Sequence, residues 1–168
     1  MKHVRVHEKY QSDYSYALTE PAGKNFDPAF KPDLTPKQMF QLGIFGGDYF
    51  TEAPKEFPAD WFTGVTFSGG RGADKSLNYF RVNASQPLKV WQANDWIYPE
   101  DPHGWVLWYC RYYMGRRIPE EDARQIRRWK NMRRHITQLQ KSCLPGDEAC
   151  RPRQRQALLH WAYDARKL

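Results

Sequence analysis

The most regular pattern in this chain is a helical one, over residues 119–141. Apolar side chains recur there every three to four positions, at Ile126, Trp129, Met132, Ile136 and Leu139. This spacing is typical of one buried face of an α-helix. Pro119 followed by three acidic residues indicates the start of the helix, because proline fits the first helical position and acids favour the positive end of the helix dipole. The pattern predicts one amphipathic helix over residues 119–141.

The opposite face of this predicted helix is basic. It carries Arg124, Arg127, Arg128, Lys130, Asn131, Arg134, His135 and Lys141, and only Arg133 falls among the apolar positions. One face is therefore expected to lie in the core, and the other to form a solvated basic ridge about six turns long.

Two further helices are predicted in the second half of the chain. Residues 104–114 are apolar nearly all round, which indicates a helix buried on every side, with Asp101 and Pro102 as its cap and first residue. Residues 152–164 repeat an apolar stripe that includes Leu158 and Trp161.

The first half of the chain is less regular. Thr35-Pro36 predicts the start of a short helix, with threonine as the N-cap. Residues 1–34 contain prolines and scattered aromatic residues without a period, and are expected to be an irregular arm. The predicted fold is mainly α, with a single compact helical domain over residues 35–168 and an N-terminal arm over residues 1–34.

Charge is distributed unevenly over the 168 residues, whose formal net charge is +7. Residues 1–84 carry ten basic and ten acidic residues, whereas residues 85–168 carry sixteen and nine, so the whole excess lies in the second half. From Arg111 to Arg155 there are thirteen basic residues, eleven of them arginine. The planar guanidinium group suits phosphates and base edges, so this concentration favours a nucleic-acid partner.

A second pattern concerns residues 75–98, in which two short helices around a turn at Asn83-Ala84 would form a helix-turn-helix. The segment resembles the DNA-binding unit of excisionases and MerR-type activators, although its turn is one residue longer and Asn94-Asp95 stand where those families place a glycine. The resemblance implies that Lys89 and Gln92 face DNA. Two packed helices without DNA would produce the same hydrophobic spacing.

These patterns together predict a nucleic-acid-binding protein for DNA or RNA, with no preference between them and no indication of oligomeric state. The residues expected at the interface are Lys89, Gln92, Arg116, Arg117, Arg124, Arg127, Arg128, Lys130, Arg134 and Lys141. No apolar run reaches the roughly 20 residues that span a bilayer, so no membrane partner is expected. No secretory signal is visible at the N-terminus, which favours an intracellular location, in the cytoplasm, the nucleoid or the nucleus.

Three alternatives stay open. The basic ridge is also compatible with an ordinary solvated helix face, or with a scaffold that binds an acidic protein. An enzyme acting on nucleic acid, by base modification or glycosidic-bond cleavage, would use a residue such as His103 or Asp164. Cys143 and Cys150 flank a turn and are expected as reduced thiols or as a conditional disulfide, and neither a metal nor a cofactor is expected.

Three longer stretches, "LGIFGGDYF", "WYCRYYMGRR" and "CRPRQRQALLHWAYD", are similar to a family of short uncharacterised proteins. The resemblance covers residues 35–164. It implies one coherent domain over those residues and carries no activity with it.

Overall fold

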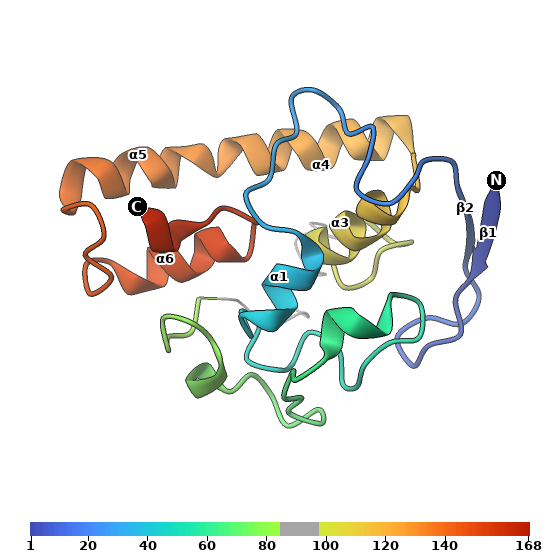
Figure 1. The fold of residues 1–168 in the computed structure, drawn as a ribbon, viewed down its shortest axis with the longest axis horizontal. Helices are drawn as coiled ribbons and strands as arrows, with labels where there is room; N and C mark the ends of the chain where they lie inside the picture. Colours follow the sequence, from blue (N-terminus) through green and yellow to red (C-terminus); the bar gives the residue numbers. More distant parts are fainter. Residues whose placement is uncertain (85–97) are drawn as a thin grey trace.

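A computed structural model of the protein describes residues 1–84 and 98–168. The fold is mainly helical, as predicted (Figure 1). Its helices are α1 (Pro36–Gln41), α3 (Trp105–Met114), α4 (Pro119–Asn131), α5 (Arg133–Ser142) and α6 (Pro152–Leu159), and its strands are β1 (Lys2–Arg5) and β2 (Ser15–Leu18). Three 3₁₀ turns complete the described elements, at Ala59–Phe62, Lys75–Leu77 and Ala165–Lys167. No described helix combines the length and the hydrophobicity needed to cross a membrane.

The N-terminal segment is more ordered than its composition predicts. β1 and β2 pair antiparallel, with Val4 opposite Tyr16. The chain then crosses the end of α3, where the amide of Thr19 donates to the carbonyl of Gly115 at 2.9 Å. Gly115 has φ +120°, and a Cβ there would lie 2.1 Å from the backbone oxygen of Glu20. The prediction of an irregular arm therefore missed a hairpin that packs directly on the helical part.

The start of α1 follows the sequence prediction. Thr35 is the N-cap, and its hydroxyl accepts from the amide of Gln38 while the Gln38 side chain accepts from the amide of Thr35. This reciprocal capping box fixes the first turn of the helix. Met39 and Phe40 of α1 are buried.

The helix predicted over residues 119–141 is divided in two. Met132 separates α4 from α5, and its amide donates to the carbonyl of Trp129, three residues back, rather than to that of Arg128. The amide of His135 donates likewise to the carbonyl of Met132. These tighter turns interrupt the α-helical hydrogen bonding. The direction of the chain is nevertheless kept, and α4 and α5 follow one another along one long edge of the molecule (Figure 1).

The other two helix predictions are confirmed in part. α3 is buried nearly all round, as its apolar composition indicates, but it is capped by Gly104 and not by Asp101. α6 ends at Leu159, five residues before the predicted end, and the chain then passes through Ala162, whose φ is +62°. α6 lies beside α5, and Leu158 and Leu159 are fully buried in the common core.

Candidate nucleic-acid interface

Three of the thirteen basic residues between Arg111 and Arg155 lie inside the molecule. Arg111 and Arg155 are 0% exposed and Arg116 is 2% exposed. Arg155 donates to backbone carbonyls at the C-terminus, including that of Ala165 at 3.1 Å. Arg116 was predicted at the interface, and its burial corrects that prediction, because a guanidinium group held inside the fold does not reach a phosphate.

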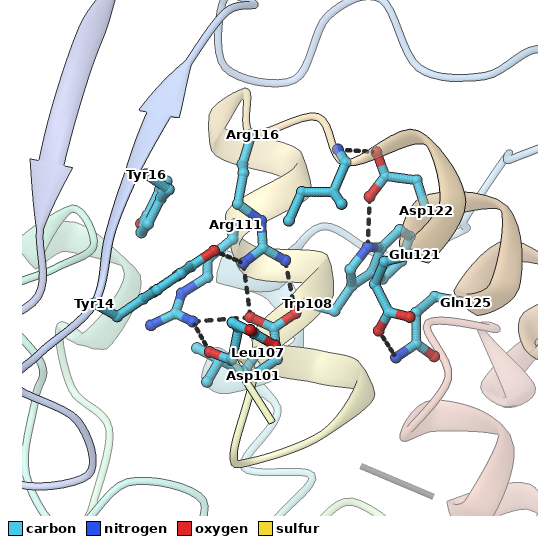
Figure 2. A network of polar contacts seen from close by, with 12 residues as sticks. Tyr14, Tyr16, Asp101, Leu107, Trp108, Arg111, Arg116, Glu121, Asp122 and Gln125 are labelled. Carbon is cyan, nitrogen blue, oxygen red and sulfur yellow. Dashed lines mark hydrogen bonds and ion pairs between the residues drawn. The ribbon is translucent and has the colours of Figure 1, made fainter. Parts of the chain in front are cut away.

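Arg111 and Arg116 belong to a buried charge network, which Figure 2 shows between α3 and the segment before it. Arg111 contacts Glu56 at 2.7 Å and Asp101 at 2.8 Å, and Arg116 contacts the other oxygen of Asp101 at 2.6 Å. Two positive and two negative groups thus neutralise one another away from water. The carboxylate of Asp101 thus accepts from the two arginines, and it does not cap the first amides of α3.

The N-terminal hairpin completes the network. Gln11 accepts from Arg111 at 2.7 Å, and the hydroxyl groups of Tyr10 and Tyr16 both donate to Glu56. Burial alone would lower the pKa of Arg111, but the hydrogen bond and charge of Glu56 raise it above the ordinary value. Arg111 therefore remains charged, and this network ties β1 and β2 to α3.

Arg117, Arg124 and Arg128 are half-buried and already have partners. Arg117 donates to the carbonyl of Tyr112 at 2.6 Å and lies over its ring. Arg124 forms a bidentate pair with Glu121, at 2.6 and 2.9 Å. Arg128 donates to Gln125 at 3.0 Å and stacks on a tryptophan ring. These three predicted interface residues are less available to a ligand than the sequence indicates.

Four predicted residues are exposed on the rod formed by α4 and α5. They are Arg127, Lys130, Arg134 and Lys141, and we call them the basic strip. On a continuous α-helix, at about 100° per residue, this spacing corresponds to an arc of about 60° and to a rise of about 21 Å from the first residue to the last. Within residues 1–84 and 98–168, no ion pair involves any of the four.

Acidic residues lie only at the N-terminal end of the rod. Glu121 and Asp122 are buried, and Asp122 accepts from the indole of Trp108 at 2.8 Å and from the amide of Ile118 at 2.9 Å. Glu120 is exposed in the first turn. No acidic residue follows in the sequence until Asp147, so the basic strip is not neutralised along its own helices.

The predicted helix-turn-helix spans residues 75–98, and the part of it that the structure describes, residues 75–84, does not form the expected first helix. Lys89 and Gln92 lie outside the described residues. Between Lys75 and Val82 the chain forms a three-residue 3₁₀ turn and then a loop. The side chain of Asn78 bonds both the amide and the carbonyl of Val82, which holds a turn where the first helix of the motif was predicted.

The two candidate catalytic residues occupy separate structural positions. The ring of His103 packs against the rings of Tyr10, Tyr49 and Phe50 at 5.1 to 5.6 Å. Asp164 caps the last 3₁₀ turn and pairs with Arg166 at 2.8 Å. No hydrogen bond joins the two residues in the part of the chain that the structure describes.

Cysteine chemistry is settled for two of the three cysteines. Cys143 and Cys150 form a disulfide that closes the turn between α5 and α6, one of the two states expected for them. Cys110 is a buried thiol on α3, and burial raises its pKa. Among the described residues, no group of three or more histidine, cysteine or acidic side chains has an arrangement that would hold a metal ion.

Burial of His103 predicts a pH-dependent stability. Burial, assisted by the positive charge of Arg111, lowers the pKa of its ring from 6.5 to about 4. Between these values the unfolded chain takes up a proton and the folded protein does not, so the free energy of unfolding should fall as the pH drops from 6.5 towards 4. The slope from this residue is at most about 1.4 kcal/mol per pH unit.

Urea denaturation at pH 7, 6, 5 and 4.5 measures this slope. We expect His103→Gln to reduce it, while His7→Gln, which alters an exposed histidine, leaves it unchanged. Equal slopes in the wild type and His103→Gln would contradict the prediction.

Comparison with protein-family models, curated proteins and solved structures found no match for the chain. The resemblances of residues 35–164 and 75–98 therefore stay predictions, and the site is interpreted from its own geometry. The buried network was missed by the sequence analysis. Its available signal was Arg111 itself, the single charged residue of an otherwise apolar helix, since a buried charge requires a partner.

Proposed function

We propose that the protein binds nucleic acid through the basic strip on α4 and α5. The observation that supports this most directly is the set of four exposed cations, spread over about 21 Å along one side of the rod, none paired with another described residue. Exposed cations without an ion pair are attracted to a chain of phosphates. Their binding releases the counterions condensed on the nucleic acid, and this release favours the complex. Surface cations that already form an ion pair, such as Lys37 with Asp60, attract phosphates less because the neighbouring carboxylate offsets their charge.

The number of available cations fixes the expected salt dependence. Six to eight phosphate contacts give a log–log slope near −5 to −7, whereas the basic strip has four residues. A duplex should then bind with a slope of about −3 to −4, and a single strand with a slope nearer −3. Fluorescence anisotropy of a labelled 20-base-pair DNA, between 50 and 200 mM salt, measures it.

Charge reversal tests which surface carries the binding. Arg127→Glu, Lys130→Glu and Arg134→Glu together should weaken binding to that duplex about 100-fold at 50 mM salt, at about 1 kcal/mol for each lost contact. Folding should be preserved because all three side chains are exposed. The matched control reverses Lys2, Lys55 and Lys75, which are also exposed but lie outside α4 and α5.

The outcomes separate the proposal from its alternatives. Equal losses in the two triple variants would show an effect of net charge alone and contradict the proposed surface. Absence of binding to DNA and RNA at 50 mM salt, together with strip-dependent binding to polyglutamate, would favour an acidic protein partner instead.

A further inference from the structure

One row of side chains on the rod can read base edges as well as contact phosphates. Arg127, Asn131 and Arg134 are spaced i, i+4 and i+7, a spacing that puts side chains on one side of an α-helix over a rise of about 10.5 Å. All three are exposed, and the row lies on the side away from the buried ring of Trp129. It crosses the junction between α4 and α5.

The chemistry of this row matches the base edges of the DNA major groove. Arginine can donate two hydrogen bonds to O6 and N7 of guanine, and asparagine can pair with N6 and N7 of adenine. Asn131 makes no side-chain hydrogen bond to a described residue. By contrast, Gln125 donates to Glu121 at 3.0 Å and Gln138 accepts from Gln154 at 2.6 Å. Among the described residues, Asn131 is thus an amide without a side-chain hydrogen bond, between two cations without an ion pair.

The surface favours a duplex over a single strand. Proteins that bind unpaired bases do so largely by stacking them on exposed aromatic side chains. Among the described residues the exposed large hydrophobic side chains are Met1, Tyr79 and Leu144, and none of them lies on α4 or α5.

The form of the rod favours DNA over duplex RNA. The rod lies along an edge of the molecule (Figure 1), and the B-form major groove, about 12 Å wide, admits an α-helix. The major groove of duplex RNA is too narrow for side chains to read. Lys130 and Lys141 lie to one side of the row, where the phosphates bordering a groove would be.

We infer that this row enters the major groove of B-form DNA, with Asn131 reading an adenine between guanines read by Arg127 and Arg134. This inference rests on the proposed function and adds a sequence preference to it. Lys130 and Lys141 contact phosphate and contribute affinity without sequence preference.

Selection from a pool of 20-base-pair duplexes with eight randomised central pairs, at 150 mM salt, tests the inference. The wild-type protein should enrich a site with one adenine position flanked by guanine. Asn131→Ala should lose the adenine preference alone and bind the enriched duplex about 10-fold more weakly, while its affinity for the starting pool is unchanged. Gln140→Ala is the matched control, because Gln140 is an exposed amide on the other side of α5.

The results that overturn the inference differ from those that overturn the proposed function. Salt-dependent binding that is lost on reversal of the basic strip but enriches no sequence would leave the function standing and remove the base-reading role of Asn131. Tighter binding to a single strand or to duplex RNA would do the same. An equal loss in Gln140→Ala would assign the effect to the helix and not to Asn131. Absence of any nucleic-acid binding would overturn both.

Discussion

Replacing Asp101 with alanine is expected to lower the free energy of unfolding by about 3–5 kcal/mol. Asp101 is fully buried and accepts from Arg111 through one oxygen and from Arg116 through both. Removing the carboxylate leaves Arg116 inside the protein without an opposite charge, while Arg111 keeps Glu56. The loss is large because the desolvation of a buried guanidinium group is no longer compensated. Urea denaturation followed by far-UV circular dichroism measures it.

A surface ion pair provides the control for this variant. Asp60 pairs with Lys37 at 3.1 Å, but the Asp60 side chain is 64% exposed, so Asp60→Ala should cost less than about 1 kcal/mol. If Asp101→Ala does not fold, Asp101→Asn, which keeps the shape and removes the charge, gives a measurable intermediate. Equal costs for the Asp101 and Asp60 variants would mean that the buried network does not stabilise the fold.

The same network marks the limit of what the sequence predicts. The helices were found because their apolar residues repeat locally, and the cap of α1 was found because Thr35 and Pro36 act on the turn that follows. The partner of Arg111 is Glu56, 55 residues away, and no periodic pattern relates two such positions. Asp101 fits the pattern of a helix cap because its neighbour is a proline, but in the structure its carboxylate accepts from the two arginines.

The candidate interface is likewise predictable only where it depends on the local helical pattern. Helical periodicity places Arg127, Lys130 and Arg134 on the solvated face, and the structure agrees. Helical periodicity does not show which of the neighbouring cations form ion pairs or hydrogen bonds within the fold. Arg124 pairs with Glu121, and Arg116 is drawn inside by Asp101. A charge count along the chain therefore overestimates the cations that a ligand meets. Of the predicted interface residues that the structure describes, the four of the basic strip are the exposed ones.

Phe30→Ala is expected to have a comparably large effect, about 3–5 kcal/mol. Phe30 comes from the segment predicted to be an irregular arm, yet it is 1% exposed. Its ring meets six others at centroid distances of 5.0 to 6.2 Å, those of Trp105, Trp108, Tyr109, Tyr112, Trp129 and, from its own segment, Phe26. The first four lie on α3 and Trp129 lies on α4, so Phe30 fills the space where the two helices pack.

The expected cost combines lost burial, the cavity left behind and the lost edge-to-face ring contacts. Phe26→Ala is the control from the same segment, because its ring is half-buried and should cost about 1 kcal/mol. Chemical denaturation gives both values, and near-UV circular dichroism should report the altered tryptophan packing only in Phe30→Ala. If Phe30→Ala cost no more than Phe26→Ala, the first 34 residues would be an appendage to the helices. A difference of several-fold would make them part of the core on which α3 and α4 assemble, and so part of what holds the basic strip in place.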